Sequence, residues 1–333
     1  MPLKAVQQAI DGGLDFVLRG QHADGRFIDW ALPPGPSSAW STAYVGLAIA
    51  ELPEAGRQRS AAAIRGAAHW LQAHPAAGGG WGYNDAVGAD AGSSAFALRL
   101  LSRMGLPVAV EHVDRLLSFQ HGDGGFSTHG SDAGFGAWGQ SQADVSAACG
   151  MALAMPGSTA APASLQRCLA YVATRRGPDG LWPSFWWRSP WYATHAALSL
   201  LKAAGVLPRP LEASCTRSDD KPLNPFEWAL ALECSLLATP RLVVQARTML
   251  AALLAVQQAD GGWPSAPVLR LARRDCAVPW AAADGGPLFA DTQRLFTTAT
   301  VLRALAAARQ LEGRRRLPEA FAHWRCVAAR TWS

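Results

Sequence analysis

Apolar residues recur at helical spacing in several stretches of the chain, with polar or charged residues between them. These stretches span residues 5–18, 62–71, 110–119, 165–172 and 243–256. Because side chains three and four positions apart share one face of a helix, each stretch predicts a helix with one buried and one wet face.

A second set of stretches is rich in alanine and leucine and carries almost no charge. They begin at Ser38, Ser93, Asp144, Tyr192, Phe226 and Leu295. A helix that is apolar on most sides must be buried on most sides. The sequence therefore predicts inner helices surrounded by the amphipathic ones.

The inner stretches repeat about every 50 residues, marked by a Ser or Thr near the start of each. The markers are Thr42, Ser94, Ser146 and Thr194, with Thr298 about two periods further on. One irregular unit lies at about 202–240, where Pro, Ser, Asp and Arg replace much of the outer helix. This pattern predicts a single all-α domain over residues 1–333, an (α/α)6 toroid in which outer helices wrap inner ones.

A loop phrase, Q-x-x-D-G-x-W/F, follows the outer stretches. It occurs at residues 21–27, 120–126 and 257–263, with degenerate copies at 78–81 and 176–182. Gly permits the left-handed backbone that ends a helix, and Gln and Asp side chains bond exposed backbone groups. We expect the aromatic residue to pack on the neighbouring repeat, so the phrase indicates the fold and not the chemistry.

Composition narrows the class of protein. Half of the 333 residues are apolar and 17% are charged, which suits a large buried core. The net charge of +5 is scattered, with no dense basic block of the kind that binds nucleic acid. Six cysteines without C-x-x-C spacing, no signal peptide and no membrane-length apolar run predict a cytoplasmic protein, with peripheral membrane contact left open.

One segment carries a family resemblance. The sequence WGYN at 81–84 is followed by DAGSSA at 90–95, at the start of an inner stretch. With its repeated loops, nearly the whole chain resembles the squalene-hopene cyclase and prenyltransferase toroid superfamily. The segment is similar to the place where class II terpene cyclases carry their D-x-D-D-[ST]-A motif, which implies cyclisation of an isoprenoid or polyene chain.

The chain departs from that motif where the chemistry starts. In the family the middle carboxylic acid protonates an alkene or epoxide, for which a neutral carboxyl in a dry pocket is suited. Here the first acid is Asp90, but the middle one falls on Gly92 and the last on Ser93. Either another carboxyl has taken over, or the chemistry begins differently, or the site is inert.

Asp90, Asp85 and Asp144 are the candidates for a relocated acid. Asp before an apolar helix most often caps that helix, and Asp85 could be a surface loop residue, so the structural roles stay open beside the catalytic one. His195 stands inside an almost wholly apolar inner stretch. It is either a satisfied core residue or a group that pairs with a carboxylate and tunes its proton.

Aromatic residues gather near the starts of the inner stretches. The candidates for binding substrate are Trp40, Tyr44, Tyr83, Phe96, Trp138, Trp186, Trp187, Trp191, Tyr192, Trp228, Trp280 and Phe289. Aromatic faces stabilise carbocations by about 0.5–2 kcal/mol each, and such a pocket suits a prenyl or polyene chain. The alternative is that these rings fill gaps between helices.

No cofactor or metal site is expected. The protein prenyltransferases of the superfamily bind zinc through Asp, Cys and His, and Asp275-Cys276 resembles the first pair. The spacing is wrong, however, and the stretch beginning at Leu295 has no His, whereas a catalytic zinc needs all its ligands. No D-D-x-x-D motif for a magnesium diphosphate is present.

The leading hypothesis is therefore a metal-independent, class II terpene cyclase-like enzyme. Two alternatives remain: a cofactor-independent cyclase or isomerase that acts on a non-terpenoid apolar substrate through His195 and a carboxylate, and a non-catalytic toroid that binds a lipid or a protein. We expect the cavity to open where the inner helices begin. Because one toroid cannot enclose a site as two do, a homodimer or another partner would cover that mouth.

Overall fold

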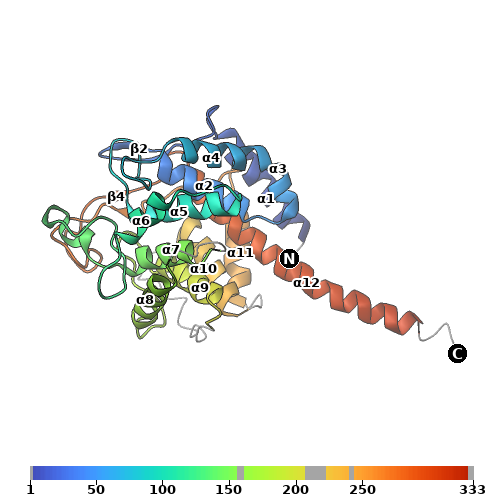
Figure 1. Cartoon of the computed structure of the whole chain (residues 1–333). Coiled ribbons are helices and arrows are strands. Elements are labelled where there is room, and N and C mark those ends of the chain that lie inside the picture. The colour runs from blue at the N-terminus through green and yellow to red at the C-terminus, as the bar shows by residue number, and fades with distance from the viewer. Residues whose placement is uncertain (1–2, 156–160, 207–222, 240–243, 329–333) are drawn as a thin grey trace.

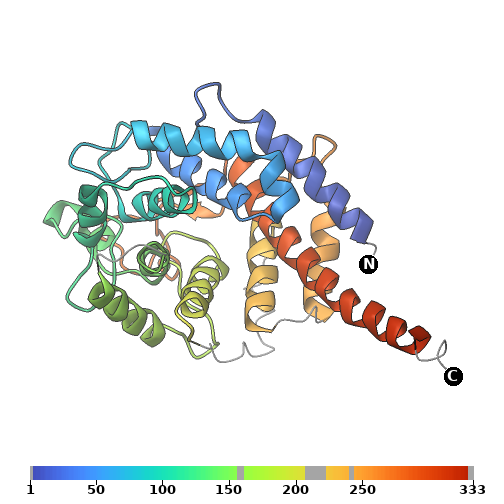
Figure 2. The same cartoon turned by 45° about the vertical axis from the view of Figure 1, so that its right-hand side comes forward.

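A ring of six helices forms the centre of the computed structural model, which describes residues 3–155, 161–206, 223–239 and 244–328 (Figures 1 and 2). Each of the six packs against the next, and the last packs against the first, so the ring is closed. The members are α2 (Ala39–Ala50), α5 (Ala91–Arg103), α7 (Ala143–Leu153), α9 (Trp191–Ala203), α10 (Pro225–Ala238) and α12 (Leu295–Ala328).

Outer helices cover this ring. They are α1 (Leu3–Arg19), α4 (Ala61–Ala73), α6 (Val110–Leu117), α8 (Pro162–Thr174) and α11 (Val244–Ala255), with the short α3 (Glu54–Arg59) before α4. In order, α4 packs on α2, α6 on α5, α8 on α7, α11 on α10 and α1 on α12. The all-α toroid predicted from the repeat is confirmed. Residues 207–222 of the irregular unit lie outside the described residues.

Burial follows the two hydrophobic patterns. Helix α2 contains no charged residue, and eleven of its 12 residues are buried, among them Val45 and Ile49. Helix α1 buries a single face that includes Val6, Ile10 and Leu14. An amphipathic helix gains from burying its apolar stripe, whereas an apolar helix must be enclosed, so the two kinds sort into outer and inner rings.

The Gln of each complete loop phrase ties neighbouring outer helices together. The side-chain amide of Gln21 donates to the carbonyl of Gly25 in its own loop at 2.7 Å and to that of Ala63 in α4 at 2.8 Å. Gln120 makes the same bond to Ser164 in α8 at 2.9 Å. Gln257 reaches Ala9 in α1 at 2.9 Å, so the last phrase closes the outer ring onto the first helix.

The Ser and Thr markers of the repeat bind the aromatic residues of the loops. The backbone N–H of Phe126 donates to Ser146 Oγ at 2.7 Å, and that of Trp263 donates to Thr298 Oγ1 at 3.2 Å. Phe27, Trp81 and Trp182 make the equivalent bonds to Thr42, Ser94 and Thr194. Each loop is thus fixed to the start of the inner helix that follows it.

The chain's own loops lie against the end of the barrel where the inner helices begin. The short strands β1 (Asp29–Leu32) and β2 (Gly35–Ser37) pair antiparallel, as do β3 (Leu269–Arg270) and β4 (Leu288–Phe289). The backbone N–H of Arg270 donates to the carbonyl of Trp186 at 2.8 Å, and Ala137, in the 3-10 helix η1 (Ala133–Gly139), donates to Arg274. The segment between α11 and α12 therefore helps to cover this end.

Helix α12 continues past the ring, and its last turns project from the body (Figures 1 and 2). Within the described residues, no helix combines the length and the apolar character that a membrane crossing requires.

Candidate active site

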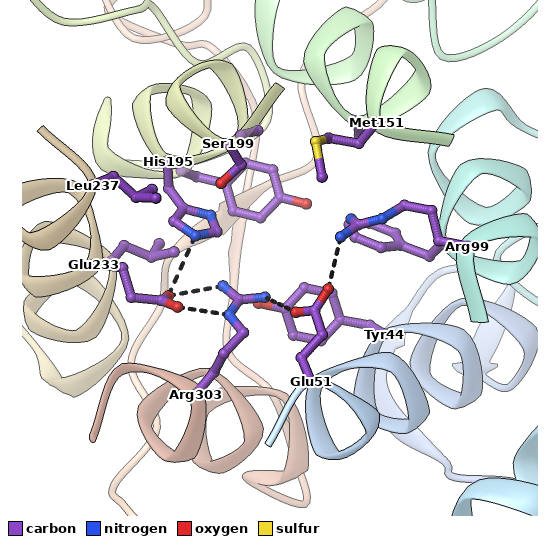
Figure 3. A pocket seen from close by; sticks show the side chains of 14 residues that line it. Tyr44, Glu51, Arg99, Met151, His195, Ser199, Glu233, Leu237 and Arg303 are labelled. Carbon is purple, nitrogen blue, oxygen red and sulfur yellow. Dashed lines mark hydrogen bonds and ion pairs between the residues drawn. The ribbon is translucent and has the colours of Figure 1, made fainter. Parts of the chain in front are cut away.

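A cavity of about 230 Å³ lies within the inner ring (Figure 3). Its apolar wall consists of Phe96, Ala148, Met151, Ala196, Leu230 and Leu237, and its polar wall of Tyr44, Glu51, Arg99, Tyr192, His195, Ser199, Glu233 and Arg303. Most of these residues stand in the middle or second half of their helices. The expectation that the cavity opens where the inner helices begin does not describe this cavity.

Nine aromatic residues fill the other end of the barrel. This aromatic cluster comprises Trp30, Trp40, Tyr44, Tyr83, Phe96, Trp187, Tyr192, Phe226 and Phe296. Tyr44 stacks on Phe296 with ring centroids 3.6 Å apart, and Trp187 stacks on Tyr192 at 4.2 Å. Because Tyr44, Phe96 and Tyr192 also line the cavity, the cluster continues directly into it.

Charged side chains from the inner helices meet at the opposite end of the cavity (Figure 3). Arg303 Nε and Nη2 donate to the two carboxylate oxygens of Glu233, both at 2.9 Å. His195 Nε2 lies 3.6 Å from Glu233 Oε2. Arg99 Nη2 donates to Glu51 Oε1 at 2.9 Å, and Glu51 Oε2 is 3.9 Å from Arg303 Nη1. We call these five residues the charged cluster.

Burial sets the protonation of this cluster. Burial, reinforced by the positive charge of Arg303, lowers the pKa of His195 well below its ordinary value, so this imidazole is neutral. Burial also opposes the charge of Arg303, but Glu233, Tyr44 and Glu51 together outweigh it and hold its pKa well above the ordinary value. For Arg99 burial prevails and lowers the pKa.

Asp90 caps α5. Its Oδ1 accepts from the backbone N–H of Ser93 at 2.7 Å, and its Oδ2 accepts from Ser93 Oγ at 2.6 Å. Burial raises the pKa of this carboxyl to about 6, although the bonds from Ser93 lower it. Asp90 does not line the cavity. Asp90 stands at the same end of the barrel as the aromatic cluster. Its backbone N–H donates to the carbonyl of Trp81, and the carbonyl of Tyr83, a nearby member of the cluster, accepts from the backbone N–H of Ser38 at the start of α2.

The other predicted carboxyls are placed differently. Asp144 Oδ2 accepts from the backbone N–H groups of Phe185 and Trp186 at 3.0 and 3.3 Å, so it fixes the loop before α9. Burial raises the pKa of Asp144 to about 6. Asp85 is exposed in the loop after Trp81. Neither carboxyl lines the cavity.

Asp29, which the sequence reasoning did not select, caps α12. Its Oδ2 accepts from the N–H groups of Leu295 and Phe296, both at 2.9 Å, and its Oδ1 accepts from Gln293 at 2.7 Å and from Trp30. Burial, and then the charge of Asp291, raises the pKa of Asp29 to about 6.

The structure divides the predicted aromatic residues among five environments. The aromatic cluster contains Trp40, Tyr44, Tyr83, Phe96, Trp187 and Tyr192. Trp138 and Trp186 contact each other in a separate small cluster with Phe185. Trp280 and Phe289 lie in the covering segment, Trp191 lies in the core and Trp228 is half-buried. Of the predicted catalytic residues, His195 alone lines the cavity.

Sequence reasoning missed four members of the charged cluster, namely Glu51, Arg99, Glu233 and Arg303. A signal for three of them was present, because Arg99, Glu233 and Arg303 each interrupt an apolar inner helix. A charge in such a place is rarely buried unless it is paired. Within the described part of the chain, no three His, Cys, Asp or Glu side chains gather as a metal site would require.

Solved structures resemble this fold. A protein from Actinoplanes is 28% identical, with a TM-score of 0.79 over 91% of this chain and 99% of that one. The type II terpene cyclase MstE from Scytonema is 24% identical, with a TM-score of 0.79 over 93% of this chain and 100% of that one. An ent-copalyl diphosphate synthase from Streptomyces platensis is 18% identical, with a TM-score of 0.58 over 81% and 50%.

No family model matches the sequence, and no curated protein matches it at a significant level. The structural likeness confirms the resemblance at the level of the fold, since the chain has an α/α toroid like that of these two cyclases.

Proposed function

We propose that the protein is a class II terpene cyclase-like enzyme, which protonates an isoprenoid or polyene chain and cyclises it inside the inner ring. The main support is that the aromatic cluster and a buried carboxyl of raised pKa occupy the same end of the barrel, and that the cluster borders a cavity within the inner ring. Structures of MstE variants bound to geranylgeranyl dihydroxybenzoate as substrate and merosterolic acid A as product support a prenylated compound as the substrate class.

Asp90 is the proposed acid. A carboxyl with a pKa of about 6 is protonated in a useful fraction of molecules near neutrality, and the bonds from Ser93 stabilise the carboxylate left after transfer. Roughly 9 Å of helix separates Asp90 from Phe96, the first α5 residue of the cavity wall. A chain held in the cavity with its terminal double bond against Tyr44, Phe96 and Tyr192 would direct that bond toward this carboxyl.

The aromatic rings then stabilise the cations that form after protonation. Tyr44, Phe96 and Tyr192 present aromatic surface at the cavity wall, and each contact with a cation contributes about 0.5–2 kcal/mol. In the overall reaction the alkene gains one proton from Asp90, carbon–carbon bonds close the rings, and the final cation loses a proton from carbon. The product is an isomer of the substrate, and the returned proton restores the acid.

A product screen by mass spectrometry tests this function. Purified protein and Asp90→Asn are incubated with farnesyl diphosphate, geranylgeranyl diphosphate, squalene and farnesoic acid, with and without EDTA. Asn is as good a helix cap as Asp, so the variant should fold. We expect an EDTA-resistant cyclic isomer whose rate of formation falls at least about 100-fold in the variant, because a general acid contributes 10²–10⁴-fold.

The pH dependence follows from the same residue. Because the reaction needs protonated Asp90, the rate should fall about tenfold per pH unit above pH 6. An unchanged rate in folded Asp90→Asn would remove Asp90 from the mechanism. Absence of turnover with all four substrates, while they bind, would favour the non-catalytic lipid-binding toroid.

A second candidate function rests on the pair of His195 and Glu233. A neutral imidazole that lies 3.6 Å from a carboxylate at the cavity wall is equipped to move a proton on a non-terpenoid apolar substrate, as a cofactor-independent cyclase or isomerase would. This alternative predicts turnover that survives Asp90→Asn and disappears in His195→Gln. The opposite pattern would exclude it.

A further inference from the structure

The cavity is aromatic at one end and charged at the other. Tyr44 and Tyr192 join it to the aromatic cluster, whereas Arg99, Glu233 and Arg303 stand further along their helices. A purely hydrocarbon substrate gains no binding free energy from charged groups in its site, and burying those groups costs free energy. The charged end therefore suits recognition of a polar head group.

Arg303 is paired with two carboxylates. Both oxygens of Glu233 accept from it at 2.9 Å, and Glu51 Oε2 lies 3.9 Å away on the other side. The two carboxylates hold the guanidinium between them, which raises its pKa. Its role in the cavity is to balance their charge.

Arg99 is compensated less well. It donates to Glu51 Oε1 at 2.9 Å, but Glu51 is shared with Arg303. Its Nε is buried and donates to no acceptor within the described residues. Its guanidinium carbon lies 5.9 Å from the centre of the Phe96 ring, and the group points into the cavity (Figure 3). An unsatisfied buried donor of a cation costs free energy that an anion beside it would recover.

We propose that Arg99 binds the singly charged, carboxylate head group of an amphipathic prenyl compound, whose chain runs from there toward the aromatic cluster. The inference rests on the proposed function for the cyclisation of the prenyl chain, whereas the binding of the head group by Arg99 does not depend on that function. Guanidinium donors match a carboxylate geometrically. Glu51, Glu233, Arg99 and Arg303 already sum to zero charge, so the cavity tolerates one added anion better than a multiply charged diphosphate.

The dimensions agree with this orientation. Roughly 14 Å of helix separates Asp90 from Arg99 along α5. An extended prenyl chain anchored at Arg99 would therefore direct its far end toward the proposed acid. The head group would stay at the charged end during cyclisation.

Binding measurements test the head-group site without requiring turnover. Quenching of tryptophan fluorescence gives the dissociation constants of farnesoic acid, farnesol and farnesyl diphosphate at neutral pH. In the native protein the acid should bind at least about tenfold more tightly than the alcohol and than the diphosphate, since hydrogen bonds to charged groups contribute about this much. Arg99→Gln should abolish the preference for the acid over the alcohol, and Arg99→Lys should retain part of it.

Arg103→Gln is the matched control. Arg103 stands on the same helix and donates to the carbonyl of Ala50, but it does not line the cavity, so its loss should leave the preference unchanged. Equal affinity for acid and alcohol in the native protein would overturn the proposal, as would tightest binding of the diphosphate. A preference that survives in folded Arg99→Gln would also overturn it. Acid-selective binding without turnover would keep this site and reject the cyclase.

Discussion

At the scale of single residues, two kinds of buried charge have different duties. Asp90, Asp144 and Asp29 each satisfy backbone N–H groups, while Glu233 and Arg303 pair between the neighbouring helices α10 and α12 at the cavity wall. The sequence predicted the cap that Asp90 provides. Its prediction of a cap at Asp144 was wrong, because Gln142 is the N-cap of α7 and Asp144 bonds the loop before α9 instead, and Asp29 was not selected. The sequence did not predict the pairing, because which charges meet depends on how the ring closes.

Gly92 is the position at which this chain departs most clearly from the acid motif. A Cβ built there would have Asp90 Oδ1 as its nearest neighbour, at 3.5 Å, which is ordinary contact. The backbone is helical, so a side chain fits without strain. The structure therefore has room for the first carbon of a side chain at the position where the motif would place its acid.

We expect Gly92→Asp to fold as well as the native protein and to cyclise prenyl substrates at least about tenfold faster. A second carboxyl beside Asp90 would share its proton, so that one of the two carboxyls stays protonated at a higher pH. An acidic side chain also suits the first turn of a helix. Gly92→Asn is the matched control and should give no increase. Equal rates for Gly92→Asp and Gly92→Asn would show that this position does not face the reaction.

At the scale of elements, the loops are better determined by sequence than the cavity is. The Gln, Gly and aromatic positions of the repeat make the bonds expected of them, since each depends on nearby backbone. The covering segment between α11 and α12 was not predicted, because its contacts with Trp186 and Ala137 join distant parts of the chain. The same holds for the cap that Asp29 provides to α12.

The Asp29 cap has a pH signature. Its folded pKa of about 6 exceeds the ordinary value of 3.8, so the native state binds more protons between these limits. This residue's contribution to the free energy of unfolding therefore falls as pH rises from about 4 to 6.

Asp29→Asn should flatten that dependence and lower the free energy of unfolding at pH 7 by about 2–4 kcal/mol, because one amide oxygen cannot serve all the N–H groups that the carboxylate serves. Urea unfolding at several pH values measures both effects. Asp24→Asn, at an exposed loop carboxyl, is the control and should change neither. An Asp29→Asn protein with native stability and pH profile would reject the cap as a stabilising element.

At the scale of the whole molecule, closure of the ring brings the walls of the cavity together. The last loop phrase meets the first helix, where Gln257 bonds Ala9 and Gly261 approaches Gly12. Gly261 has φ +92, and a Cβ there would lie 2.2 Å from the carbonyl oxygen of Gly12. No side chain larger than hydrogen fits at this seam.

Gly261→Ala should accordingly destabilise the protein by more than about 3 kcal/mol and reduce substrate binding, since the clash adds to the cost of a left-handed backbone. Gly105→Ala is the matched control: its φ is +65, yet nothing lies within 4 Å of its Cβ. There we expect about 1–2 kcal/mol, the backbone cost alone. Thermal and urea unfolding of both variants give the comparison. Equal losses of unfolding free energy in the two variants would mean that the contact between α11 and α1 can shift to accommodate a methyl group.

The repeat predicted the toroid, because helical periodicity and loop chemistry are local properties of the sequence. The candidate site was predicted in part: His195, Tyr44, Phe96 and Tyr192 line the cavity. Its charged end was not anticipated, since Glu51, Arg99 and Arg303 come together only when the first and last repeats meet.

The central claim is that a proton added to an alkene starts the reaction, and deuterium labelling tests it most directly. The protein is exchanged into D₂O and incubated with the four prenyl and polyene substrates, and the products are analysed by mass spectrometry. Protonation by an exchanged Asp90 followed by loss of a proton from carbon predicts a cyclic product that carries one deuterium and is correspondingly heavier than the substrate. A cyclic product without deuterium would contradict an acid-initiated mechanism.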